Sequence, residues 1–171
     1  MGTFKGKVLV VDDTEPNVKL LRALLKGAGY EVVTAANGTE GLTAVAQENP
    51  DLILLDIMMP DLTGFEVCQR LRAAPETSQI PIIFLTALHE MEDHMKAVDV
   101  GGDDVLTKPI NKLELLIRVK SLLRIRELTL QAEERRRTIH SLLKSYVSAE
   151  AAERYLSDPD SVRSLGLDAT S

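Results

Sequence analysis

Short apolar runs that alternate with helix-like stretches constrain the fold of this chain more than any other feature. Five runs rich in aliphatic and β-branched residues occupy positions 8–11, 30–34, 52–55, 82–85 and 105–106. All but the mixed run at 30–34 are continuously apolar, which is typical of strands buried on both faces of a parallel sheet. The runs therefore predict five strands.

Apolar residues at helical spacing, bounded by Gly, Asn or Pro, predict a helix after each strand. In chain order they are Val18, Leu21, Leu25 and Ala28; Ala44 and Val45; Phe65, Cys68 and Leu71; Met91, Met95 and Val98; and Leu113, Leu116 and Ile117. Asn111 is the expected N-cap of the last helix. Five alternating strands and helices predict an α/β fold, a doubly wound parallel sheet with helices on both faces.

Polar side chains follow four of the five runs. Asp12 and Asp13 follow the first run, Asp56 the third, Thr86 the fourth and Lys108 the fifth. Open α/β sheets bind ligands outside the carboxyl ends of their strands, where all parallel strands end together. We therefore expect three carboxylates, a hydroxyl and an ammonium group to converge at one edge of the sheet.

These groups suit phosphoryl transfer. Clustered carboxylates repel each other unless a cation compensates their charge, and Mg²⁺ prefers carboxylate, water and phosphate oxygens. An aspartate can attack phosphorus and carry the phosphoryl group as an acyl phosphate. Lys108 can hold one phosphoryl oxygen, and the Thr86 hydroxyl can donate a hydrogen bond to another.

The motifs at these positions resemble the receiver domain of two-component response regulators. They are Asp12-Asp13, Asp56 with Met59-Pro60 and Gly64, Thr86-Ala87, and Lys108-Pro109, and the stretch from Gly101 to Pro109 is especially similar. The resemblance covers about residues 5–125. It implies a (βα)5 flavodoxin-like fold with strand order 2-1-3-4-5.

By this resemblance, the protein is a phosphorylation-dependent signalling switch rather than an enzyme. Asp56 would accept phosphate from a sensor histidine kinase. Asp13 and Asp56 would ligate Mg²⁺ directly, together with the backbone carbonyl of Met58, and Asp12 would act mostly through water. The only chemistry expected of such a protein is its own phosphorylation and dephosphorylation.

The resemblance also implies how the phosphoryl group is sensed. Thr86 and Lys108 would contact it, and a cis bond before Pro109 would aim the lysine into the site. Receivers commonly carry an aromatic switch residue three positions before this lysine, but here that residue is Val105. Since valine has no ring to rotate, Thr86 and the following loop 87–89 are expected to carry more of the signal.

The last helix is predicted to continue far beyond the receiver domain. No glycine or proline occurs from Asn111 to Leu156, and a helix of that length cannot be buried by one small domain. One possible heptad seam consists of Leu122, Ile125, Thr129, Ala132, Arg136, Ile139, Leu143 and Tyr146. This seam predicts a coiled coil and a homodimer, with a single solvated helix kinked near 135–137 as the alternative.

The predicted organisation is therefore a receiver domain at 1–125, a helical or coiled-coil linker at 126–156 and a loosely ordered tail at 157–171. The stretch from His140 to Pro159 resembles the segment that precedes class III adenylate or guanylate cyclase domains. That resemblance implies a regulatory part of a longer enzyme, whose cyclase output domain is absent from this chain.

Composition restricts the remaining function classes. A net charge of −6 argues against nonspecific nucleic-acid binding, and the extension has no second helix-turn-helix pattern for DNA recognition. No apolar run reaches the length of a membrane span, and no signal peptide is visible at the N-terminus. With Cys68 as the only cysteine, we expect a cytoplasmic protein.

Two other functions compete with the receiver interpretation. Haloacid-dehalogenase-type hydrolases also use an aspartate nucleophile with Mg²⁺, but they place a second aspartate two residues later, where this chain has Met58. Turnover of a phosphate monoester would distinguish them. A degenerate receiver acting as a dimerising adaptor is the other candidate, and the intact set of acidic, hydroxyl and ammonium side chains argues against it.

Overall fold

The computed structural model of this chain describes residues 6–87 and 91–157. Its strands are β1 Lys7–Val11, β2 Glu31–Ala35, β3 Leu52–Asp56, β4 Ile82–Thr86 and β5 Asp104–Thr107. They form one sheet in the order β2-β1-β3-β4-β5, and every neighbouring pair is parallel. The predicted flavodoxin-like topology is confirmed.

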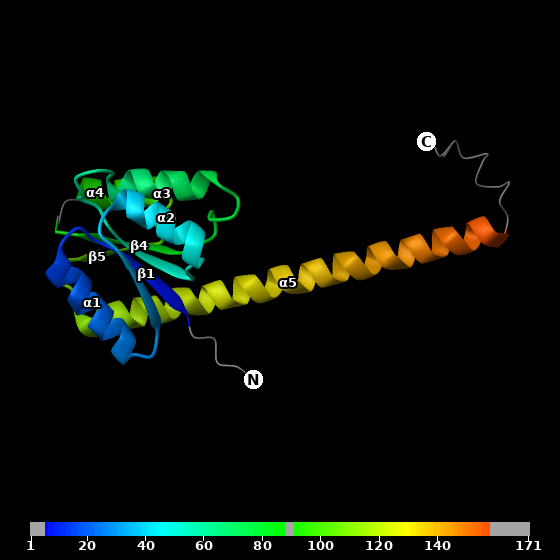
Figure 1. Cartoon of the computed structure of the whole chain (residues 1–171), viewed down its shortest axis with the longest axis horizontal. Helices are drawn as coiled ribbons and strands as arrows, with labels where there is room; N and C mark the ends of the chain where they lie inside the picture. The colour runs from blue at the N-terminus through cyan, green and yellow to red at the C-terminus, as the bar shows by residue number, and fades with distance from the viewer. Residues whose placement is uncertain (1–5, 88–90, 158–171) are drawn as a thin grey trace. The chain divides into compact units, whose positions relative to one another are not determined.

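Helices cover both faces of the sheet (Figure 1). They are α1 Glu15–Gly27, α2 Gly38–Glu48, α3 Gly64–Ala73, α4 Met91–Asp99 and α5 Lys112–Ser157. One core cluster joins α1 and the start of α5 to the sheet, and a second joins α2, α3 and α4 to it. Alternate residues of a strand point to opposite faces, so Val8 and Val10 enter the first cluster and Leu9 the second.

Local capping explains where several helices begin and end. The side chain of Asn37 accepts a hydrogen bond from the Glu40 amide, and Asn49 ends α2 in the left-handed region with φ 46°. Asn111 accepts from the Glu114 amide at 3.0 Å and opens α5 as predicted. The side chains of Asn37 and Asn111 satisfy amides that the helix itself leaves without partners.

The apolar residues that predicted α4 do not face the core. Met91, Met95 and Val98 are 75%, 61% and 69% exposed, whereas Ala97 is the buried residue of this helix. In α5, similarly, Leu113 and Ile117 are exposed; the buried positions are Leu115, Val119 and Leu123. Both helices thus present apolar side chains on the outside of the domain.

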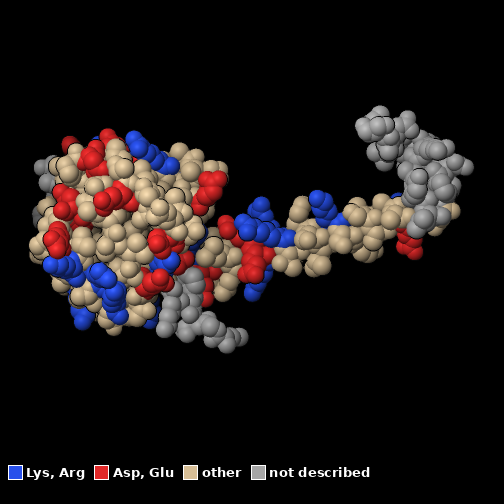
Figure 2. Space-filling model, in the orientation of Figure 1, with Lys and Arg blue, Asp and Glu red and all other residues tan. Residues whose placement is uncertain are grey.

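The chain divides into two compact units, Met1–Glu127 and Leu128–Ser171. In the second unit, α5 continues as one helix through the arginines at 135–137 to Ser157, and side chains from Gln131 to Arg154 are all exposed. Figure 2 shows clusters of acidic and basic side chains along this helix, separated by uncharged stretches. The predicted tail beyond Ser157 lies outside the described residues.

No helix in the described part of the chain combines the length and the apolar character that crossing a bilayer requires.

Arg72 connects its own helix, α3, to two loops at the edge of the sheet where the strands begin. Its guanidinium donates to the carbonyls of Gly101 at 2.9 Å, Ser78 at 3.0 Å and Ile80 at 2.7 Å. It also pairs with Asp103 at 3.0 Å, and only 20% of the arginine side chain is exposed. The Arg72 guanidinium therefore satisfies acceptors in the loop before β4 and in the loop between α4 and β5.

Replacing Arg72 with methionine should lower the free energy of unfolding by about 2–4 kcal/mol, because partly buried acceptors lose a charged donor. Urea denaturation measures the change. Arg70→Met, at an exposed position of the same helix, is the control and should cost less than about 0.5 kcal/mol. Equal losses in the two variants would contradict this assignment.

Candidate functional site

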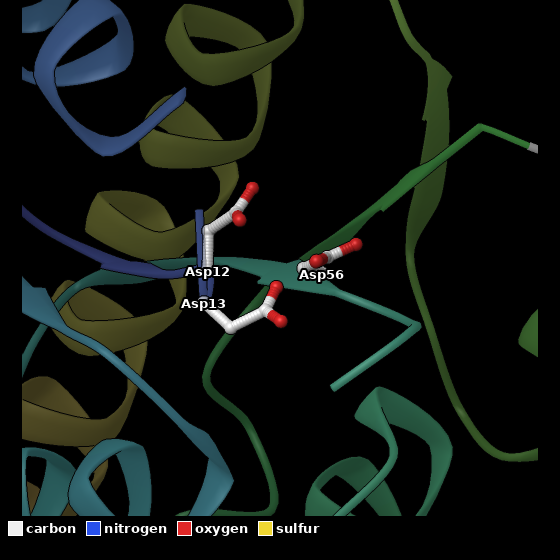
Figure 3. Close-up of side chains that lie close together, drawn as sticks. All are labelled: Asp12, Asp13 and Asp56. Carbon is white, nitrogen blue, oxygen red and sulfur yellow. The ribbon is translucent and has the colours of Figure 1, made fainter. Parts of the chain in front are cut away.

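Three carboxylates gather where β1 and β3 end (Figure 3). Asp12 and Asp13 directly follow β1, and Asp56 is the last residue of β3. Each residue offers one oxygen, and these oxygens lie within 4.8 Å of one another. Asp12 and Asp56 are buried, at 1% and 4% exposure, whereas Asp13 is exposed. The cluster is thus closed on the protein side and open on the other.

Lys108 places one ammonium group between two of these carboxylates. Its Nζ lies 3.1 Å from Oδ2 of Asp12 and 3.3 Å from Oδ1 of Asp56. The lysine follows β5, its backbone amide donates to the Thr86 carbonyl at 2.7 Å, and its bond to Pro109 is cis, as the resemblance implied. Burial alone would lower the pKa of Lys108, but the hydrogen bond to Asp12 and the charge of Asp56 raise it.

The electrostatics leave Asp56 short of positive charge. Burial and the neighbouring Asp12 raise the pKa of Asp56 from 3.8 to about 6, although Lys108 opposes the shift. One ammonium group does not compensate three carboxylates, and a hard divalent cation would remove the remaining repulsion. The donor set, three carboxylates with one open side, fits Mg²⁺ on chemical grounds.

The loop between β3 and α3 is held closely against the cluster. The Ile57 amide donates to the Leu85 carbonyl at 3.2 Å, and the Gly64 amide donates to the Ile57 carbonyl at 2.9 Å. A Cβ atom at Gly64 would collide with the carbonyl oxygen of Asp56, so only glycine permits this approach. Met58 lies in this loop, two residues after Asp56, with its side chain 64% exposed.

The remaining predicted site residues lie on β4 and β5 or directly after β5. Thr86 is 1% exposed at the end of β4, next to the residue that pairs with Asp56 in the sheet. Val105 is partly buried on β5 and lines a groove of about 440 Å³ that also involves His94 of α4 and Arg118 of α5. Pro109 is exposed.

In the loop after Thr86, Ala87 is exposed, and Leu88 and His89 lie outside the described residues.

One residue near the cluster was missed by the sequence analysis. Asp61 accepts hydrogen bonds from the amides of Gly38 and Thr39 and from the Thr39 hydroxyl. Its partners lie 22 and 23 residues away in the chain, so no local pattern could have indicated the contact.

Comparison with known proteins agrees with this geometry. The family model of the response regulator receiver domain matches residues 8–120. The chain is 45% identical over 123 residues to the response regulator PleD of Caulobacter vibrioides, covering 72% of this chain and 27% of PleD. It is 44% identical over 118 residues to the DNA-binding transcriptional regulator RpaA of Synechocystis, covering 69% of this chain and 49% of RpaA.

Solved structures show the same fold. The chemotaxis protein CheY4 of Vibrio cholerae superposes with a TM-score of 0.66 at 35% identity, covering 69% of this chain and 98% of CheY4. The receiver domain of a Pseudomonas aeruginosa sensor histidine kinase, described with a magnesium ion coordinated in its active-site cleft, gives 0.65 at 28% identity and covers 70% and 98%.

This chain belongs to the response regulator receiver family. Receiver domains bind Mg²⁺ at an acidic pocket, which corresponds here to the cluster of Asp12, Asp13 and Asp56. The chain spans about a quarter of PleD and about half of RpaA.

The raised pKa of Asp56 predicts a pH-dependent cost to stability in the absence of divalent metal. The folded state binds this proton more tightly than the unfolded chain, so the protonated carboxyl stabilises the fold fully below pH 3.8, and this stabilisation is lost as the pH rises through about 6. Asp56→Asn should therefore stabilise the protein by roughly 1–3 kcal/mol at about pH 7.5 in EDTA.

Urea denaturation of both proteins at about pH 7.5 and about pH 4 measures this difference, which should shrink at the lower pH. Added Mg²⁺ should stabilise the wild type more than the variant. A stability difference that is the same at both pH values would contradict the prediction.

Proposed function

We propose that this chain is a receiver switch that is phosphorylated on Asp56 by a sensor histidine kinase in a Mg²⁺-dependent reaction. The observation that carries the proposal is the buried Asp56 carboxylate, held beside two further carboxylates and 3.3 Å from the Lys108 ammonium group. Family membership supports it, since receiver domains are phosphorylated by histidine kinases.

The residues of the site divide the work of the transfer. A carboxylate oxygen of Asp56 attacks phosphorus as the bond to the donor's imidazole nitrogen breaks, and an acyl phosphate results. Asp13, Asp56 and the Met58 carbonyl would hold Mg²⁺ directly, and Asp12 would act mostly through water. The bound ion would neutralise charge on the phosphoryl oxygens. Asp56 must be ionised to attack, and the positive charge of Lys108 favours that form.

Two groups would then sense the product. The Lys108 ammonium would move from its carboxylate partners toward a phosphoryl oxygen, and the Thr86 hydroxyl would donate to another. Both residues sit where a strand meets the loop that leads to a helix, Thr86 before α4 and Lys108 before α5. Differential contact in the phosphorylated state would shift the population of arrangements of these helices.

The signal would leave through the face formed by α4, β5 and α5. Exposed apolar side chains line this face, among them Val98 of α4 and Ile117 of α5. Val105 replaces the usual aromatic switch residue there, so Thr86 and the following loop 87–89 are proposed to carry more of the signal, with the cis bond before Pro109 aiming Lys108 into the site. The partly buried Val105 lines the groove between the two helices, where a rotating ring would otherwise act.

The extended α5 is proposed to form a coiled-coil homodimer that relays the change. The exposed apolar members of the predicted seam include Ile125, Ile139, Leu143 and Tyr146, each at least 57% exposed. Leu122, at the start of the seam, instead packs partly against the receiver core. Pairing with a second copy would remove the exposed seam residues from water, as a heptad repeat requires.

The division into a receiver at 1–125, a linker at 126–156 and a tail at 157–171 remains part of this proposal, as does a cytoplasmic location. The output is proposed to be a cyclase domain, on the resemblance of the stretch from His140 to Pro159 alone.

Incubation with acetyl phosphate and Mg²⁺ should attach one phosphoryl group to the wild-type chain, detected by intact-protein mass spectrometry. Asp56→Asn should take up none, because it has no carboxylate to attack phosphorus. Lys108→Ala tests the sensing role: it should still be labelled, but without the helix rearrangement. Equal labelling of wild type and Asp56→Asn would refute the site.

Disulfide crosslinking tests the coiled coil. The only native cysteine, Cys68, is buried, so a cysteine introduced into α5 reports its own contacts. Ile139→Cys, in the seam, should form covalent dimers, whereas Ser141→Cys, on the outer face of the same helix turn, should form few. Crosslinking yields that do not change with phosphodonor would contradict the relay, and equal yields at the two positions would contradict the seam.

A further inference from the structure

We propose that Asp61 is a positioning residue for the metal site, because its carboxylate ties the loop between β3 and α3 to the first turn of α2. This inference rests on the proposed function, in which the Met58 carbonyl of that loop is a Mg²⁺ ligand. Asp61 would not touch the metal; it would hold the loop in the geometry that the metal needs.

The contacts form a three-point clamp. Oδ1 of Asp61 accepts from the Gly38 amide at 3.1 Å, and Oδ2 accepts from the Thr39 amide at 2.8 Å and from the Thr39 hydroxyl at 2.7 Å. Both amides belong to the first turn of α2, where helical amides have no partner within the helix. The hydrogen bonds from Thr39, more than any other contact, hold the pKa of Asp61 well below its usual range.

The clamp joins the two loops that border the acidic cluster. On one side, the Asp12 amide donates to the Ala35 carbonyl at 3.2 Å, so the turn that leads into α2 adjoins Asp12. On the other side, the clamped loop leaves β3 directly after Asp56. Asp61 therefore links the chain beside Asp12 to the chain beside Asp56.

Close packing beneath the clamp shows that the two loops are in tight contact. A Cβ atom at Gly38 would lie 2.7 Å from the Cβ of Leu62 and 3.2 Å from its carbonyl oxygen. Buried Ile57 and Met59, on either side of Met58, anchor the start of the loop in the core, and the Thr63 capping box fixes its end. Asp61 adds the polar link between these anchors.

Groups that orient metal ligands from outside the coordination sphere are commonly worth about tenfold or more in metal affinity. If the clamp fixes the loop, Asp61→Ala should weaken Mg²⁺ binding by about tenfold. The Mg²⁺ affinity is measured by titration, with the NMR signals of backbone amides as the readout. Thr39→Val removes one of the three hydrogen bonds, keeps the charge of Asp61, and should weaken binding by a smaller factor.

Asp51→Ala is the matched control. Asp51 is also a loop carboxylate that accepts a backbone hydrogen bond, from the Lys7 amide at 2.8 Å, but it lies where the strands begin. Its loss should lower the melting temperature and leave Mg²⁺ affinity unchanged. An Asp61→Ala protein that binds Mg²⁺ like the wild type would overturn the inference.

Salt separates the clamp from a simple loss of negative charge near the site. A long-range charge effect fades at about 0.5 M KCl, where the Debye length is only about 4 Å, whereas a change in loop geometry persists. An affinity difference that disappears in high salt would overturn the inference. A wild-type protein that binds no Mg²⁺ and takes no phosphoryl group would instead overturn the proposed function.

Discussion

One ammonium group, that of Lys108, lies against two buried carboxylates. This excess of negative charge is the constraint around which the receiver domain is built. Asp12 and Asp56 lie 3.1 and 3.3 Å from the same ammonium group, and the exposed Asp13 adds a third negative charge. Burial, and then the charge of Asp12, raise the pKa of Asp56 although Lys108 opposes the shift. A site that is undercompensated in this way favours a divalent cation.

The fold keeps these like charges together because the sheet leaves them little freedom. Asp56 is part of β3, which lies between β1 and β4 and is buried along its whole length. Gly64 brings the start of α3 against the Asp56 carbonyl, and the backbone bond from Lys108 to Thr86 joins the ends of β4 and β5. The repulsion between the carboxylates is therefore confined to one edge of the sheet, and burial of the apolar strands stabilises the fold against it.

Patterns within a few residues were enough to predict much of this structure. Continuous apolar runs located the strands, and parallel pairing brought Asp12, Asp13, Asp56 and Lys108 to one edge. The contacts of Asp61, and those of Arg72 with Gly101 and Asp103, were not predictable, because these partners lie more than 20 residues away and are mostly backbone atoms that carry no sequence signature. The outward face of α4 was also missed, since spacing indicates a helix but not which side is buried.

Helix α5 combines two environments in one continuous element. Its first turns place Leu115, Val119 and Leu123 in the core at a spacing of four residues, which fixes how this segment is rotated against the sheet. From Gln131 to Arg154 the described side chains are exposed, and apolar residues such as Ile139 and Tyr146 recur at seven-residue intervals. The exposed turns therefore carry the apolar residues that the proposed homodimer would remove from water.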